Sequence, residues 1–280
     1  MYDTSKYSVI MSLYAKEKPE YLSPAIDSML NQTIKPDEIV IVEDGPLTDE
    51  LYKVLDLYKK DYPDVIRTVR CEVNIGLGLA LNCGINECKN EIVARMDTDD
   101  IAKPDRCEKQ LMMFNQDSEL SIVGAFVEEF FDDPSKVVSV RAVPLTHEEI
   151  YEFAKRRSAF NHPVVMYRKS KVLENGGYSN LRRNQDVDLF GRMLFNGCKA
   201  RNVGESLLYF RSNDDLAKRR KSWQNTISYI DTIKRFHKMG YSSMVDYLII
   251  AIAQTGMFLM PVKLQHFIYK NFLRKQGSEI

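Results

Sequence analysis

Three carboxylates within four residues form the strongest chemical signal in this sequence. They follow the apolar stretch 92–96, and the residues in order are Asp97, Thr98, Asp99 and Asp100. Carboxylate oxygens are the preferred ligands of hard divalent cations, so a turn that carries Asp97 and Asp99 can bind Mn²⁺, Mg²⁺ or a sugar hydroxyl. The alternatives are a solvated turn, or a turn in which Asp99 or Asp100 caps a helix that begins near Pro104.

The composition limits the kinds of partner that the chain can attract. Its 280 residues, 44% apolar and 28% charged, can bury one large core with a small appendage. The 39 basic and 39 acidic side chains give a formal net charge of zero, so overall charge does not attract nucleic acid, and we expect no nucleic-acid partner. Five cysteines without a Cys-x-x-Cys pair, and no secretory signal at the start, favour a cytoplasmic protein without disulfides or structural zinc.

The first hundred residues alternate between two periodic patterns. Short apolar, β-branched runs predict buried strands at 7–13, 38–43, 65–71 and 92–96. Between them, apolar residues at helical spacing and turn residues predict helices at 21–31, 48–62 and 74–88. This alternation predicts an α/β fold with a doubly wound, mostly parallel sheet, in which ligands bind outside the carboxyl ends of the strands.

Polar residues end three of these predicted strands. Ser12 and Tyr14 end the first, Asp44 ends the second, and Asp97 with Asp99 follows the fourth. Strands joined by right-handed crossovers bring these loops to one edge of the sheet. There Tyr14 can flank a base, Asp44 can accept a hydrogen bond from a base imide, and the aspartates can take a ribose hydroxyl and a cation. Singly these residues suit packing or turns, but together they favour a nucleotide crevice.

The glycine-containing segment 74–82, Asn-Ile-Gly-Leu-Gly-Leu-Ala-Leu-Asn, resembles a phosphate loop without matching one. It has neither Gly-x-Gly-x-x-Gly nor Gly-Lys-Ser/Thr, which disfavours a dinucleotide-binding fold. Its glycines allow the start of a helix to approach either a ligand or a neighbouring loop closely, and the sequence supports both readings equally.

These pieces together resemble the family 2 glycosyltransferases with the GT-A fold, in particular the bacterial polysaccharide-assembly branch typified by amylovoran biosynthesis enzymes. The resemblance extends from about residue 7 to 221 and rests on the stretches SVIMSLY, QT, PDEIVIVEDGP, NIGLGLALN, ARMDTDD and NHP, which occur in this order. It implies transfer of a hexose or N-acetylhexosamine from a UDP-sugar to an acceptor hydroxyl, with inversion and with Mn²⁺ or Mg²⁺ as cofactor. The acceptor implied is a glycan or a lipid-diphosphate-linked saccharide of the cell surface.

The resemblance also implies roles for individual residues. Ser12, Tyr14 and Asp44 are similar to the uridine-binding set, with Glu17 as a further candidate. Arg95 and Asp97 correspond to ribose or diphosphate contacts, and Asp99 to the metal-binding carboxylate of Asp-x-Asp, which Asp97 completes. The remaining candidates for nucleotide-sugar contacts are Asn74, Gly76, Asn82, His162, Arg219 and Arg220.

A catalytic base is expected in the segment 184–190, which reads Asn-Gln-Asp-Val-Asp-Leu-Phe. An inverting transfer needs one carboxylate to remove the proton of the acceptor hydroxyl. In the family this place commonly reads Glu-Asp, an aromatic residue, Asp, Leu and Trp, so Asp186 aligns with the usual base. Gln185 replaces the glutamate and Phe190 the tryptophan, which leaves the local charge open. Asp188 is the second candidate, and both aspartates also suit a helix N-terminus.

The chain divides by composition into residues 1–221, a GT-A domain, and residues 222–280, a helical extension. Within the first part, 1–120 should bind the nucleotide-sugar and 121–221 the acceptor, with strands at 121–131 and 136–142 forming a hairpin. The basic run 215–221, with Arg219 and Arg220, suits a solvated face or a loop that covers the diphosphate. The same charges also suit contact with anionic lipid headgroups or a lipid-diphosphate acceptor.

The extension is apolar at 247–260 but too short to span a bilayer, which needs about 20 residues. Basic residues lie beside aromatic ones in the stretch that follows. Residues 244–275 therefore suit peripheral contact with the inner face of the cell membrane, a buried helical pair or a homo-oligomer interface.

Two other classes of protein remain compatible with the sequence. A nucleotidyltransferase also uses such a sheet and carboxylate-held metal, but it typically has a glycine-rich, basic loop after its first strand, where this chain has Ser-Leu-Tyr-Ala-Lys-Glu at 12–17. A non-catalytic nucleotide-sugar-binding protein is supported only by Gln185, since Asp99 and Asp186 are both present.

Overall fold

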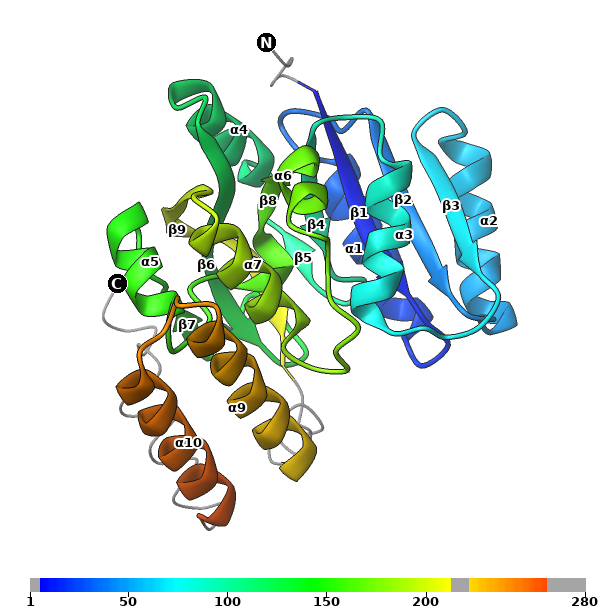
Figure 1. Cartoon of the computed structure of the whole chain (residues 1–280). Coiled ribbons are helices and arrows are strands. Elements are labelled where there is room, and N and C mark those ends of the chain that lie inside the picture. The colour runs from blue at the N-terminus through cyan, green and yellow to red at the C-terminus, as the bar shows by residue number, and fades with distance from the viewer. Residues whose placement is uncertain (1–5, 213–221, 261–280) are drawn as a thin grey trace.

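A computed structural model describes residues 6–212 and 222–260, which form a sheet covered by helices on both faces, with a helical hairpin at one side (Figure 1). The sheet has the strand order β3-β2-β1-β4-β8-β6-β9-β5, and β7 pairs with β6. Its first half consists of the parallel strands β1 (Tyr7–Leu13), β2 (Glu38–Asp44), β3 (Ile66–Cys71) and β4 (Ile92–Met96). These four strands agree with the predicted ones to within a residue. Runs of Val, Ile and Met covered on both faces suit the inner strands β1, β2 and β4, whereas β3 lies at the edge of the sheet.

Two apolar cores lie on opposite faces of this sheet. One core packs under α1 (Pro19–Leu30), α2 (Asp49–Asp61) and α4 (Arg106–Gln116). The other packs under α3 (Leu77–Glu87), α5 (His147–Ala154), α6 (Lys169–Glu174) and α7 (Gln185–Phe195). Thr48 caps α2 through the backbone N–H of Leu51, as expected. A Cβ added at Gly84 would lie 2.6 Å from a Val42 methyl, so glycine allows α3 to sit tightly on the strands.

The second half of the sheet is mixed. β8 (Met166–Arg168) follows the 3₁₀ turn η1 (His162–Val164) and runs antiparallel to β4. β6 (Leu120–Phe130) and β7 (Ser139–Arg141) form the predicted antiparallel hairpin. β9 (Lys199–Arg211) lies parallel to β6 and also pairs with the two-residue β5 (Ile101–Ala102).

The sequence analysis missed β9, the longest of the described strands. Its buried residues do not alternate regularly, because its register against β6 shifts and Arg, Asn, Gly and Glu interrupt its apolar residues. The short β5 and α6 also carry too few residues to produce a periodic signal.

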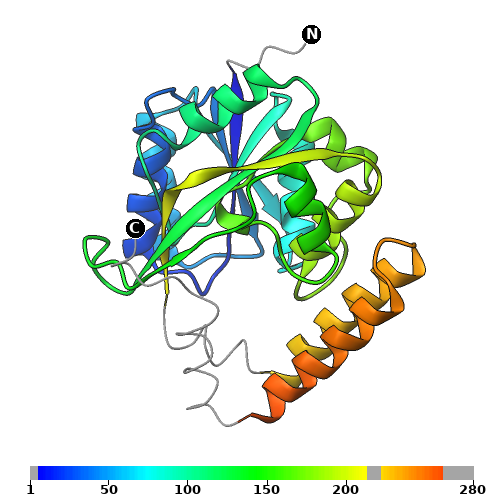
Figure 2. The same ribbon diagram turned by 90° about the vertical axis from the view of Figure 1, so that its left-hand side faces the viewer.

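The extension forms a helical hairpin of α9 (Trp223–Lys238) and α10 (Met244–Leu259), which lies beside the sheet-containing body (Figure 2). Phe236 of α9 packs against Gly191 of α7, where an added Cβ would lie 2.1 Å from the ring. Ser243 begins α10 with a capping box. In the described ranges 6–212 and 222–260, no helix has the length and apolarity needed to cross a membrane.

Candidate functional site

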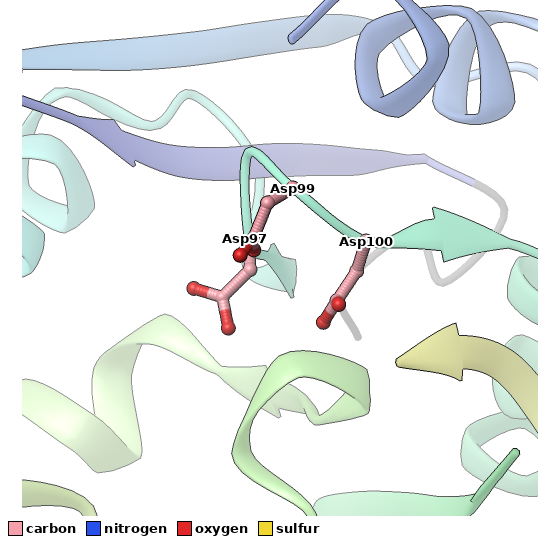
Figure 3. Close-up of side chains that lie close together, drawn as sticks. All are labelled: Asp97, Asp99 and Asp100. Atoms are coloured by element: carbon pink, nitrogen blue, oxygen red, sulfur yellow. The ribbon is translucent and has the colours of Figure 1, made fainter. Parts of the chain in front are cut away.

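The carboxyl ends of β1, β2 and β4 meet at one edge of the sheet, because these strands are parallel neighbours. The turn between β4 and β5 lies at this edge, and Figure 3 shows Asp97, Asp99 and Asp100 projecting from it. One carboxylate oxygen from each of these residues lies within 4.8 Å of the others. Three oxygens at this spacing are compatible with one hard cation. The helix-cap alternative is wrong, since α4 begins after Asp105.

Arg95 lies beneath this turn and forms an ion pair with Asp97. The Arg95 side chain is only 2% exposed, and its Nε and Nη1 atoms have no hydrogen-bond partner among the described residues. A buried guanidinium with free donors favours a negatively charged group beside it. Arg95 therefore holds Asp97 in place and leaves donors for a further anion.

A second arginine holds the other end of the turn. The backbone N–H of Arg211 donates to Asp100 Oδ1 at 2.8 Å, and its Nε donates to the carbonyl of Asp99 at 2.9 Å. The guanidinium lies between two rings, 4.0 Å from the centroid of Tyr21 and 4.6 Å from that of Phe130. Arg211 therefore fixes the carboxylate turn against α1 and β6.

Burial makes this concentration of negative charge costly. The pKa of Asp99 is raised to about 6, first by burial and then by the charge of Asp97. Burial, followed by the charges of Asp99 and Asp97, raises the pKa of Asp100 well above its usual value. Two guanidiniums face three carboxylates, so the ionised cluster carries one uncompensated negative charge. A divalent cation would neutralise it.

Asp44 holds the glycine-containing segment against the sheet edge. Its carboxylate accepts hydrogen bonds from the backbone of Ile75 at 2.7 Å, the backbone of Gly76 at 3.1 Å and the side chain of Asn74 at 3.0 Å. Gly76 has φ of +89°, a conformation that favours glycine, and it precedes α3 directly. Asp44, Asn74 and Gly76, all predicted to bind nucleotide, therefore form one connected unit in which most of the carboxylate's acceptor capacity is used internally.

Asn82 and His162 both bind the loop before α7. The Asn82 side chain donates to the carbonyl of Tyr178 at 2.7 Å and accepts from its N–H at 2.8 Å. The Tyr178 hydroxyl then lies 2.8 Å from His162 Nε2. Burial and the nearby charge of Arg95 lower the pKa of His162 well below its usual value, so the imidazole is neutral at pH 7. The chain Asn82–Tyr178–His162 therefore ends close enough to Arg95 for its charge to act on His162.

The two candidates for the base have different surroundings. Asp186 is half-buried near Arg95 and Asp97, and burial raises its pKa. Asp188 is buried and is paired with Arg192 at 2.9 Å and with Arg235 at 3.2 Å. Asp186 is therefore the better candidate for taking a proton, whereas Asp188 joins α7 to α9.

Gln185, in the position of the family's glutamate, is buried, and its Oε1 has no partner among the described residues. Because this amide is neutral, Asp97 remains the negative group that acts on Asp186, and position 185 adds no second one.

The remaining predicted site residues lie at or beyond the same edge. Ser12 is half-buried near the end of β1, and the Tyr14 carbonyl accepts from the Glu17 N–H at 3.0 Å in the following turn. Arg219 and Arg220 lie outside the described residues. Sequence reasoning missed Asp100 as a member of the carboxylate cluster, although its place beside Asp99 was a signal. It also missed Arg211, because only the unpredicted β9 brings it to the turn.

The raised pKa of Asp99 leads to a stability prediction. Its folded-state pKa of about 6 exceeds the unfolded value, so the metal-free protein loses stability as the pH rises through 6. We expect Asp99→Asn to increase the free energy of unfolding by about 2 kcal/mol at pH 8, and by little at pH 4. Urea unfolding in a chelator measures this, with the exposed Asp64→Asn as control. A variant less stable than the wild type at pH 8 would contradict the electrostatic interpretation.

Comparison with known proteins agrees with this geometry. Residues 8–177 match the family model described as glycosyl transferase family 2. A UDP-Gal:alpha-D-GlcNAc-diphosphoundecaprenol beta-1,3-galactosyltransferase of Escherichia coli is 36% identical over 273 residues, which are 98% of each chain. The amylovoran biosynthesis glycosyltransferase AmsE of Erwinia amylovora is 36% identical over 264 residues, 94% of this chain and 98% of the relative.

Solved structures support the fold. A mannosyltransferase of Pyrobaculum calidifontis, PcManGT, in complex with GDP-Man and Mn²⁺, gives a TM-score of 0.64 at 15% identity and covers 96% of this chain and 81% of its own. The predicted GT-A architecture is confirmed, with its mostly parallel first half and helices on both faces. From the family match over more than half of its length and its similarity to these full-length relatives, the chain belongs to the family 2 glycosyltransferases.

Proposed function

We propose that this glycosyltransferase moves a hexose or N-acetylhexosamine from a UDP-sugar to an acceptor hydroxyl, with inversion, during assembly of a bacterial surface polysaccharide such as capsule, exopolysaccharide or O-antigen. The observation that carries the proposal is the carboxylate cluster of Asp97, Asp99 and Asp100 at the sheet edge. Asp186 lies close enough to this cluster for the charge of Asp97 to act on it. The Escherichia coli relative is named for a UDP-Gal donor, which supports UDP as the nucleotide.

We assign Mn²⁺ or Mg²⁺ to Asp97 and Asp99, with Asp100 beside them. The fit rests on the donor set, since three carboxylate oxygens within 4.8 Å of one another suit a hard cation, and on the uncompensated charge of the cluster. When bound, the cation supplies neutralisation of the negative charge that develops on the leaving diphosphate. The free donors of Arg95 lie under the same turn and can add hydrogen bonds to that anion.

The nucleotide is placed at the ends of β1 and β2. We assign Ser12, together with Tyr14 and Glu17 in the turn after β1, to contacts with the base. Asp44 positions Asn74 and Gly76, so its role in base recognition is shared with the segment that it holds. Arg219 and Arg220 stay assigned to the diphosphate by resemblance alone.

Asp186 carries the proton transfer in this mechanism. One of its carboxylate oxygens takes the proton of the acceptor hydroxyl as that oxygen forms a bond to the anomeric carbon. The bond from the anomeric carbon to the diphosphate breaks, and UDP leaves with the electron pair. The raised pKa of Asp186, caused by burial, makes its carboxylate a stronger base than an exposed aspartate.

Substitution of the base separates catalysis from binding. We expect Asp186→Asn to lower the rate of sugar transfer by about 10²- to 10⁴-fold while UDP affinity stays within a few-fold of wild type. Turnover is measured with UDP-galactose, UDP-glucose and their N-acetyl forms, using a saccharide linked to a lipid diphosphate as acceptor. Asp231→Asn, an exposed aspartate on α9, is the matched control. Wild-type activity in Asp186→Asn would remove the base assignment, and UDP binding without turnover in the wild type would favour a non-catalytic binding protein.

We also propose that α10 contacts the inner face of the cell membrane. Val245, Leu248, Ile249, Ile252 and Leu259 recur at helical spacing and are 43–74% exposed. On α9, Trp223 and Ile227 are also exposed. An amphipathic helix with such a face binds at the boundary between headgroups and acyl chains. The Escherichia coli relative is named for an acceptor linked to diphosphoundecaprenol, which supports a membrane-bound substrate.

A charge on this face tests membrane contact. Ile252 is 73% exposed, so Ile252→Glu should fold normally and weaken co-sedimentation with phosphatidylglycerol vesicles at least tenfold. Gln224→Glu, an exposed polar site on α9, adds the same charge and should have little effect. If Ile252→Glu binds vesicles normally but changes the sedimentation from dimer to monomer, the face is a homo-oligomer interface instead.

A further inference from the structure

A cavity separate from the carboxylate cluster lies between α7 and α9. Its volume is about 430 Å³, and the residues that line it are Ser179, Asp188, Arg192, Arg235, Lys238 and Met239. Three of the six carry a positive charge and one a negative charge. A hollow of this kind, with more cations than anions, suits an anionic ligand.

Several donors in this cavity have no acceptor within the described part of the chain. The Oγ of Ser179 and the Nε of Arg235 are both shielded from solvent and form no hydrogen bond there. Lys238 is exposed, and no ion pair or hydrogen bond of its ammonium group is present among the described residues. Hydroxyl, guanidinium and ammonium donors around one hollow match a group with several acceptor oxygens.

The single carboxylate in the cavity does not satisfy these cations. Asp188 Oδ2 accepts from Arg192 at 2.9 Å and Asp188 Oδ1 lies 3.2 Å from Arg235. Arg192 also donates to the carbonyl of Gly177 at 2.7 Å, so its guanidinium is fully engaged. The one negative charge of Asp188 balances only one of the two guanidiniums. The cavity therefore keeps two positive charges, one from the arginine pair and one from Lys238.

The cavity adjoins the proposed active site through two elements. Ser179 and Gln185 both approach the start of α3, where a Cβ added at Gly78 would lie 3.2 Å from the Ser179 carbonyl. The loop that carries Ser179 therefore covers the helix that follows the Asp44-bound segment. α7 itself carries Asp186 in its first turn and the buried Asp188 two residues further along. A ligand that reaches around the N-terminus of α7 can contact both.

We propose that this cavity binds the diphosphate of a lipid-diphosphate-linked saccharide acceptor, with Ser179, Arg235 and Lys238 as the contacting residues. This inference rests on the proposed function, since it assigns the acceptor class of the same site. The acceptor sugar then lies at Asp186, and its diphosphate lies on the α9 side of α7. The same saccharide without its diphosphate lacks these contacts and binds less well.

A binding experiment without donor tests the site directly. The probe is N-acetylglucosamine linked through an α-diphosphate to a short alkyl chain, titrated calorimetrically into the wild type and into Ser179→Ala/Lys238→Gln. Neither change removes a bond that holds the described fold, and Arg235 stays in its ion pair with Asp188. We expect affinity for the probe to fall about tenfold in the double variant, and the alkyl N-acetylglucosaminide without diphosphate to bind both proteins equally. Lys234→Gln, an exposed lysine on the same helix, is the control.

The outcomes separate this inference from the proposed function. Equal binding of the diphosphate probe by wild type and double variant overturns the site, whether or not the enzyme transfers sugar. Variant-sensitive binding of the probe together with a raised KM for this acceptor supports it. Probe binding that depends on the two residues in a protein that transfers no sugar overturns the proposed function and retains the anion site. A further outcome is a double variant that binds the probe as the wild type does but no longer binds phosphatidylglycerol vesicles. That result assigns Lys238 to lipid headgroups and also overturns the inference.

Discussion

The crowding of three carboxylates in one partly buried turn is the constraint on which the rest of the site depends. Ionised carboxylates are stable in a protein interior only when cations and hydrogen-bond donors surround them. Arg95 supplies one cation from β4 itself, and Arg211 supplies the other from the distant β9. A bound divalent cation would neutralise the remaining negative charge, and a ligand that brought one would stabilise the folded protein.

Each half of the sheet contributes different residues to this site. The parallel half brings the ends of β1, β2 and β4 to one edge, where Asp44 fixes the segment before α3. The mixed half approaches from the other side, because β8 pairs with β4 and thereby carries the η1 turn and His162 toward Arg95. The loop before α7 connects these halves, since Tyr178 bonds both Asn82 and His162. The residues around the carboxylate turn thus come from elements that are far apart in the sequence.

Local periodicity was sufficient to predict the parallel half of the fold. Strands such as β1 and β4 are continuous apolar runs, and the polar residues at their carboxyl ends indicate where the site lies. β9 has no such run, because polar residues interrupt it and its register is irregular. The role of Arg211, which lies at the end of β9, could therefore not be predicted either. Asp188 shows a second limit, because spacing alone does not reveal that Arg192 and Arg235 engage it across a helix interface. The same holds for Asp44, whose acceptors are occupied by a segment 30 residues later in the chain.

Calorimetric titration of UDP into the wild type and Asp99→Asn, each with and without Mn²⁺, tests most directly whether metal and nucleotide meet at the carboxylate turn. We expect micromolar binding by the wild type with Mn²⁺, and at least tenfold weaker binding when either the cation or the Asp99 carboxylate is absent. Far-ultraviolet circular dichroism establishes that both proteins are folded. UDP binding of equal strength in all four titrations, or none in a folded wild type with Mn²⁺, would contradict the assignment.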